Sequence, residues 1–148
     1  MSWLTILRKR PRFREVFHDF DYSKVATMGE NDVERLLQDA GIIRHRGKIE
    51  STINNANRAR ELVQSHGSLA AFLWRYEPDP SGTAEPQTAS TSPESVALSK
   101  DLKKLGWKFV GPTTVYAFMQ AMGLINDHVE DCAIRAEVER ARRKFKRP

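Results

Sequence analysis

The stretch LGWKFVGPTTVYAFMQAMGLINDHVEDC, residues 105–132, decides the fold prediction because it joins a glycine-bracketed turn to a helical pattern. Gly106 and Gly111 flank this turn, and glycine permits a positive φ and a close approach of the backbone to another surface. Pro112 and Thr113 then open a helix, where the missing N–H of proline does no harm. The spacing fits a helix-hairpin-helix, and it equally fits an ordinary loop between two packed helices.

The turn has the chemistry of a phosphate-binding segment. A backbone turn that leads into a helix N-terminus exposes N–H groups, and these suit the oxygens of a phosphate. We therefore predict DNA contacts from Gly106, Lys108, Gly111 and Thr113, with the backbone of residues 108–113 as the main donor.

The remaining chain reads as helix and turn, with no alternating strand pattern of useful length. We predict an all-α, compact multi-helix domain over residues 1–132, followed by a basic tail at 133–148 that forms a fraying helix or a disordered arm. Pro11 should break the first helix, Gly41 should end the helix over residues 31–40, and residues 77–91 should form a loop. The predicted helices cover residues 2–10, 12–17, 23–28, 31–40, 69–76, 93–105 and 112–122. The segment 41–50 leads into a further long helix that ends near residue 66.

Composition restricts the class of protein. The chain has 148 residues, a hydrophobic share of 40% and a net charge of +5, which is typical of a globular protein with a preference for polyanions. It has no apolar run of membrane-spanning length. A single cysteine excludes an internal disulfide and fits the reducing cytoplasm.

Two groups of cations are candidates for further phosphate contacts. Arg44, Arg46 and Lys48 stand at the start of a long helix, where positive charge is unfavourable beside the helix dipole. Phosphate binding would explain them, and a solvated surface would explain them as well. The cations of residues 140–147 could add weak, salt-dependent affinity for DNA.

His128 and Cys132 lie four residues apart and could face one way on a helix. Imidazole and thiolate are good zinc ligands, and structural zinc binds four such donors. The other histidines are scattered and no second cysteine exists. The pair is therefore half of a metal site, or a capping histidine beside a buried thiol.

Several blocks of the chain, in the right order, resemble DNA-3-methyladenine glycosylase I. They are Ser2-Trp3, DVERLLQDAGIIRHRGKI at 32–49, LSKDLKKLGWKFVGPTTVYAFMQAMGLINDH at 98–128, and Cys132. The resemblance implies an all-helical member of the helix-hairpin-helix DNA glycosylase superfamily that carries zinc. Such enzymes flip an alkylated adenine out of duplex DNA and hydrolyse its N-glycosidic bond.

The resemblance also implies roles for individual residues. His128 and Cys132 match two of four zinc ligands, and Trp3 matches an aromatic that lines the base pocket. The other two ligands, a base-reading glutamate and a pocket tyrosine belong to an N-terminal segment before residue 1. We therefore expect a chain that lacks this segment and is weak or inactive. Asn126 stands where many members of the superfamily have a catalytic aspartate, and no catalytic residue can be assigned.

Alternatives to these roles remain open. Trp3 could instead anchor the first helix in the core, and Trp107 and Phe109 are expected to be core residues. The predicted function is excision of 3-methyladenine from double-stranded DNA by a cytoplasmic monomer. The chain could instead be a non-catalytic helix-hairpin-helix module that binds DNA, or a helical protein-binding domain with an incidental basic surface.

Overall fold

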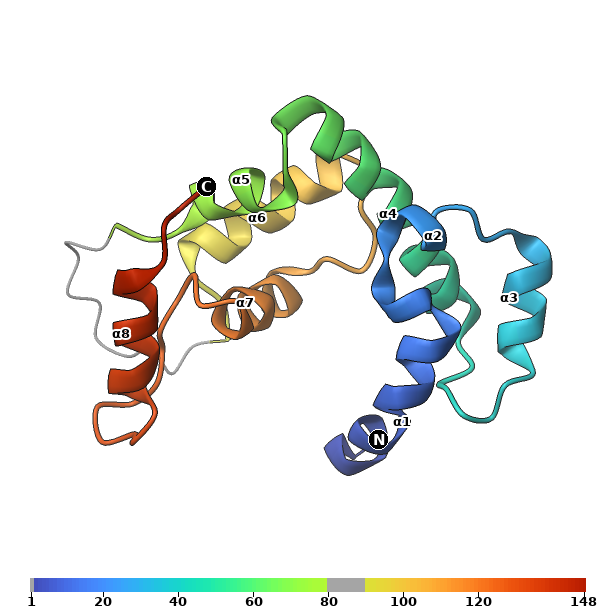
Figure 1. The fold of residues 1–148 in the computed structure, drawn as a ribbon, viewed down its shortest axis with the longest axis horizontal. Helices are drawn as coiled ribbons and strands as arrows, with labels where there is room; N and C mark the ends of the chain where they lie inside the picture. The colour runs from blue at the N-terminus through green and yellow to red at the C-terminus, as the bar shows by residue number, and fades with distance from the viewer. Residues whose placement is uncertain (1, 80–89) are drawn as a thin grey trace. The chain divides into compact units, whose positions relative to one another are not determined.

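The computed structural model describes residues 2–79 and 90–148, and in these two ranges the chain forms helices and no strand (Figure 1). The all-α prediction is confirmed. Ten residues of the predicted loop, 80–89, lie outside the described residues. The α-helices are α1 (Trp3–Val16), α2 (Tyr22–Val25), α3 (Glu30–Leu37), α4 (Arg46–His66), α5 (Leu69–Leu73), α6 (Pro93–Lys104), α7 (Pro112–Ala121) and α8 (Arg135–Lys144), with 3-10 helices η1 (His18–Phe20) and η2 (Trp74–Tyr76).

The contacts divide the chain into two compact units. Unit 1 runs to Gln64 and also includes Gly106–Phe109, and unit 2 holds Ser65–Leu105 and Val110–Pro148. This division differs from the predicted domain 1–132 with a tail at 133–148, because residues 133–148 belong to unit 2. None of the helices in the described ranges is long and apolar enough to cross a membrane.

Unit 1 is built around an apolar core that α1, α2, α3 and α4 share. Its buried side chains are Val16, Phe17, Val25, Met28, Val33, Leu36, Ile42, Ile49 and Ala56. The predicted break at Pro11 is wrong, since α1 continues through this proline. A proline inside a helix costs about 3 kcal/mol. The burial of Val16 and Phe17 at the end of α1 offsets this cost, because packing rather than propensity stabilises most helices.

The end of α3 is also set by tertiary contacts. The helix stops at Leu37, before the predicted end near Gly41. Asp39 has left the helix, and its carboxylate accepts hydrogen bonds from the Gly41 N–H at 2.7 Å and from Arg12 Nε on α1 at 2.8 Å. An aspartate that can bond its own turn competes with the helix, and here the turn also ties α3 to α1.

Unit 2 contains α6 packed against α7, the two helices that the glycine-bracketed turn connects. Leu98, Leu102, Val115 and Met119 are buried in these helices. The predicted start of α6 is confirmed, because the Ser92 hydroxyl accepts a hydrogen bond from the Ser95 N–H at 3.2 Å and Pro93 takes the first helical position.

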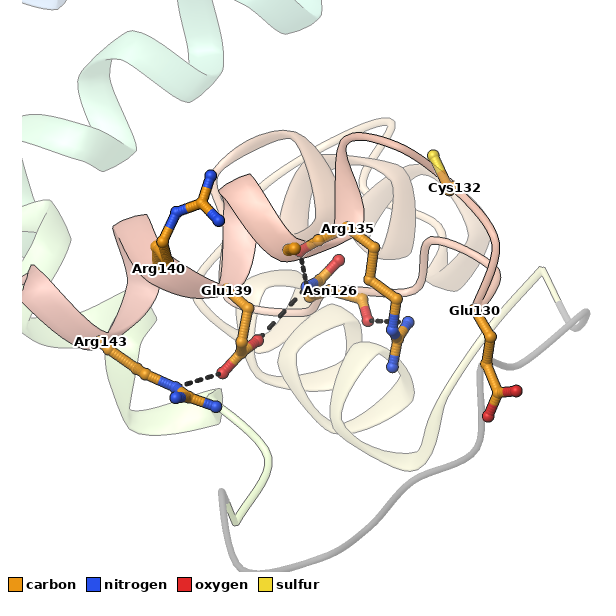
Figure 2. A pocket seen from close by; sticks show the side chains of 8 residues that line it. Asn126, Glu130, Cys132, Arg135, Glu139, Arg140 and Arg143 are labelled. Carbon is orange, nitrogen blue, oxygen red and sulfur yellow. Dashed lines mark hydrogen bonds and ion pairs between the residues drawn. The ribbon is translucent and has the colours of Figure 1, made fainter.

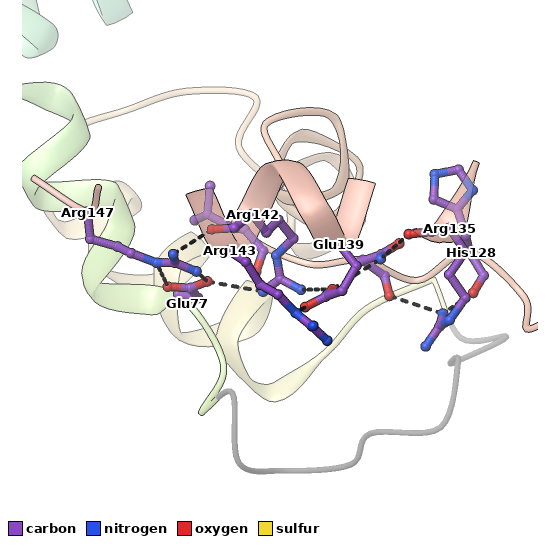
Figure 3. Close-up of polar contacts among 9 residues, drawn as sticks. Glu77, His128, Arg135, Glu139, Arg142, Arg143 and Arg147 are labelled. Atoms are coloured by element: carbon purple, nitrogen blue, oxygen red, sulfur yellow. Dashed lines mark hydrogen bonds and ion pairs between the residues drawn. The ribbon is translucent and has the colours of Figure 1, made fainter. Parts of the chain in front are cut away.

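The C-terminal residues are more ordered than we predicted. Residues Arg135–Lys144 form α8, and the following chain is held to the rest of unit 2 (Figure 3). Glu77 binds both Arg142 and Arg147, and the Phe145 ring stacks on Trp74 with centroids 4.7 Å apart. Of the two predicted states, the helix is present and the disordered arm is wrong, because contacts with residues about 70 positions away hold this segment.

Candidate nucleic-acid interface and metal half-site

Two asparagines of α4 hold the loop Gly106–Phe109. Asn55 forms a double contact with Lys108: its Oδ1 accepts from the Lys108 N–H at 2.9 Å, and its Nδ2 donates to the Lys108 carbonyl at 2.9 Å. Asn54 Nδ2 donates to the Gly106 carbonyl at 2.9 Å. The loop conformation is therefore set in the free protein and does not have to form on binding.

The glycine-bracketed turn requires glycine at only one of its two ends. Gly106 has a φ of +81°, and a Cβ there would lie 3.2 Å from Arg58 Cδ. Gly111 has a φ of −62°, which any residue can adopt, and open space surrounds the position of its missing Cβ. Glycine at 106 serves the turn itself, whereas glycine at 111 keeps the surface clear at the start of α7.

Phe109 does not pack into the core as we predicted. Its side chain is 56% exposed, and the ring meets His45 edge-on with centroids 6.2 Å apart. Its φ is +56°, a left-handed conformation that a non-glycine residue adopts only when the surroundings enforce it. Trp107 is half-buried, in closer agreement with the prediction.

The turn exposes several backbone donors, as predicted, but Lys108 is not one of them. Its N–H is bound to Asn55, so Lys108 can contribute only its exposed ammonium group. Within the described part of the chain, the N–H groups of Phe109, Val110, Gly111 and Thr113 have no hydrogen-bond acceptor. In unit 2, the N–H groups of Val110, Gly111 and Thr113 at the start of α7 are donors of the kind that bind phosphate.

The basic cluster before α4 divides into one neutralised and two available cations. Arg46 lies between Glu30, at 2.7 Å, and Glu34, and these contacts raise the pKa of its guanidinium. Arg46 therefore has little charge to offer a phosphate. Arg44 and Lys48 are exposed, and the described residues place no carboxylate in ion-pair distance of either.

Trp3 lies on the surface at the first residue of α1. Its side chain is 81% exposed, so the alternative that it anchors the helix in the core is wrong. The Ser2 hydroxyl caps the helix by accepting from the Thr5 N–H at 3.2 Å. An indole held on a capped helix presents a flat face to which a base could stack.

His128 and Cys132 are brought together, although not by a helix. Both lie in the turn between α7 and α8, and His128 Nδ1 is 3.4 Å from Cys132 Sγ. A tetrahedral zinc ion with ordinary Zn–N and Zn–S bonds would place these atoms about 3.5 Å apart. The pair therefore fits zinc as two of four donors. The described residues contain no group of three or more such side chains.

The turn that carries this pair is fastened to α8. Arg135 donates to the carbonyls of Asn126, at 3.4 Å, and His128, and Asn126 Nδ2 donates to the Arg135 carbonyl at 3.1 Å (Figure 3). A pocket of about 410 Å³ lies here, bordered by Cys132 and by α8 side chains (Figure 2). The role of Asn126 in the structure is thus to hold this turn.

Asn54 and Asn55 are functional residues that the sequence did not predict. Asparagine is a poor residue for the interior of a helix because its side chain competes for the backbone. Two adjacent asparagines in the middle of a 21-residue helix are therefore a sign of a tertiary role. Their partners, 52 and 53 residues later, could not be read from this pattern.

We expect Asn55→Ala to lower the affinity for an undamaged DNA duplex about five- to tenfold. The change removes both hydrogen bonds to Lys108, each with a net value of about 1 kcal/mol, and so loosens the loop around Lys108. Fluorescence anisotropy measures the affinity. Asn57→Ala is the matched control, because the Asn57 amide contacts Ala26 and Ile53 rather than the loop. Equal affinities of the two variants would contradict this role of Asn55.

Comparison with known proteins assigns the chain to a family. The family model for methyladenine glycosylase matches residues 1–136. The chain is 50% identical over 136 residues to DNA-3-methyladenine glycosylase 1 of Escherichia coli, a match that covers 89% of this chain and 73% of that protein. It is 41% identical over 136 residues to DNA-3-methyladenine glycosylase of Haemophilus influenzae, which covers 89% of this chain and 74% of that one.

Solved structures agree with this assignment. The chain is similar, with a TM-score of 0.82 and 38% identity, to the 3-methyladenine DNA glycosylase I of Staphylococcus aureus, described for its recognition of 3-methyladenine; the match covers 91% of this chain and 74% of that one. The sequence blocks, the helical fold and these relatives together show that the chain belongs to the methyladenine glycosylase family.

Proposed function

We propose that this protein acts in base-excision repair by hydrolysing the N-glycosidic bond of 3-methyladenine in alkylated double-stranded DNA. The observation that carries the proposal is the identity of 50% over 136 residues with the Escherichia coli DNA-3-methyladenine glycosylase 1. The family match at residues 1–136 includes the exposed indole of Trp3 and the phosphate-accessible turn. We further propose that the protein works as a monomer in the cytoplasm.

The substrate itself supplies much of the driving force. Methylation at N3 gives adenine a positive charge, so the base leaves as a neutral molecule and needs little acid assistance. The protein must extrude the nucleotide, hold the base and favour an electron-poor sugar. Extrusion costs a few kcal/mol, and a damaged base lowers this cost.

Different residues contact the DNA backbone and the extruded base. The free N–H groups of Val110, Gly111 and Thr113 bind a phosphate, and the ammonium group of Lys108 adds charge. Arg44 and Lys48 contact the backbone elsewhere along the duplex. The extruded base stacks on Trp3, which returns about 1–3 kcal/mol.

We propose that His128 and Cys132 supply two donors to a structural zinc ion. Such an ion would tie together the turn between α7 and α8, and it takes no part in the chemistry of the base. Wild-type protein titrated with Co²⁺ is expected to show a thiolate-to-metal absorption band, and Cys132→Ser should abolish it. His128→Ala should weaken binding of the ion, whereas His66→Ala, a change at the end of α4, should not. A band that survives Cys132→Ser would show that the thiolate is not a ligand.

The decisive experiment follows the release of free base. Alkylated duplex DNA is incubated with the 148-residue protein, and 3-methyladenine is separated from the polymer by chromatography. We expect slow release that still exceeds the spontaneous loss of the base, and no release of unmodified adenine. Duplex binding without any base release would instead identify a non-catalytic DNA-binding module.

A further inference from the structure

The net charge of the protein is concentrated in its last sixteen residues. Residues 133–148 contain seven Lys and Arg and two Glu, a net charge of +5, which equals the net charge of the whole chain. The preceding 132 residues hold the other 17 cations and 17 carboxylates, so they are formally neutral. The family match ends at residue 136, so nearly all of this charge lies beyond it.

The structure distinguishes which of these cations are available. Arg142 and Arg147 are bound to Glu77, and Arg143 lies 3.7 Å from Glu139. Arg135 donates to backbone carbonyls. The remaining three are exposed and have no carboxylate partner among the described residues: Arg140, Lys144 and Lys146.

Two of the three available cations share one side of an ordered helix, and Lys146 lies two residues beyond its end. Arg140 and Lys144 are four residues apart on α8, which places them on the same face. Arg140 points away from Glu139 (Figure 2). The opposite face of α8 holds Arg135, Glu139 and Arg142, which are half-buried against unit 2. Arg140 and Lys144 therefore stand on an ordered helix, and Lys146 follows in the segment that Phe145 and Arg147 hold to unit 2.

We propose that Arg140, Lys144 and Lys146 form an auxiliary surface that binds the phosphate backbone of duplex DNA. This inference rests on the proposed function, which makes DNA the partner, and it adds a contact region outside the family match. Cations that bind DNA phosphates release the counterions that surround DNA, and this release increases the affinity. The gain depends on neither the base sequence nor the presence of a lesion. The surface would retain the protein on undamaged DNA while it searches for the altered base.

The test compares two triple variants of the full chain with equal loss of charge. The first is Arg140→Gln with Lys144→Gln and Lys146→Gln. The control is Arg14→Gln with Arg60→Gln and Lys100→Gln, three exposed cations outside α8 that the described carboxylates do not pair. Each protein is titrated with a fluorescent undamaged duplex at several NaCl concentrations. Thermal unfolding checks that both variants remain folded.

We expect the α8 variant to bind about tenfold more weakly at roughly 50 mM NaCl, and its log–log salt slope to fall by about two to three. The control should change far less. Equal weakening of both variants would overturn the proposal, because net charge alone would then explain it. Unchanged binding by the α8 variant would also overturn it, and would point to an acidic protein or an anionic membrane as the partner of α8.

Base release is measured on the same proteins as a separate quantity. If wild-type protein releases no 3-methyladenine but the α8 variant still shows the predicted loss of duplex affinity, the proposed function fails and the α8 surface stands. If release is normal and the salt slopes of wild type and variant coincide, the α8 surface fails and the proposed function stands.

Discussion

Replacing Glu77 with Gln is expected to lower the free energy of unfolding by about 2–4 kcal/mol, because it leaves two arginines without their shared carboxylate. The Glu77 side chain is only 11% exposed and that of Arg142 is 16% exposed, so water cannot replace the lost partner fully. Arg147 adds a two-pronged contact, with Nε 2.9 Å from Oε2 and Nη2 2.6 Å from Oε1 of Glu77. In a protein of this size the melting temperature should fall by about 5–15 °C.

The loss of unfolding free energy in Glu77→Gln should become smaller in acid. The hydrogen bond from Arg147, and after it the one from Arg142, hold the pKa of Glu77 below its usual value. A carboxylate whose pKa is lowered by folding stabilises the protein fully above the unfolded-state pKa, near 4.3, and loses this contribution as the pH falls through the folded-state pKa. The difference between wild type and Glu77→Gln should therefore be constant from pH 7 to about pH 5.5 and shrink in stronger acid.

Urea unfolding at pH 7 and pH 3 measures both effects. Glu137→Gln is the matched control, because Glu137 lies on α8, is exposed and has no cationic partner in the described ranges. Its stability should stay within about 0.5 kcal/mol of wild type. Equal stabilities of the Glu77 and Glu137 variants at pH 7 would show that the contacts around Glu77 do not stabilise unit 2.

Trp3→Ala is expected to reduce kcat/KM for release of 3-methyladenine about 5- to 150-fold with almost no change in stability. Loss of base stacking accounts for about 1–3 kcal/mol of this effect. An indole that is 81% exposed contributes little to the core, so the melting temperature should remain close to that of wild type. This separation of activity from stability distinguishes a base-contacting residue from a packing residue.

Two further variants define the cause of the loss. Trp3→Phe keeps an aromatic face and should recover part of the activity. Leu7→Ala removes another exposed apolar side chain of α1, 55% exposed, and should leave kcat/KM within about twofold of wild type. A Trp3→Ala protein with full activity would remove Trp3 from the proposed base-binding site.

The sequence by itself determined the all-helical fold, the family and the helix boundaries that depend on near neighbours. The start of α6 at Ser92–Pro93 and the start of α7 at Pro112 follow from capping and turn chemistry within a few residues. The proximity of His128 and Cys132 was also predicted from their spacing, although a turn brings them together instead of a helix. The zinc ion, the DNA contacts of the turn and the role of Trp3 stay predictions.

Only the tertiary structure decided which charges and polar groups are available. In the folded chain, Arg46 forms ion pairs with Glu30 and Glu34, and the Lys108 N–H donates to Asn55. Glu77 holds α8 through its ion pair with Arg142. Each of these contacts joins residues 12 to 65 positions apart. A cap or a turn depends on atoms that the local backbone already holds close, whereas an ion pair or a loop support depends on how distant segments fold together, and no local pattern records that.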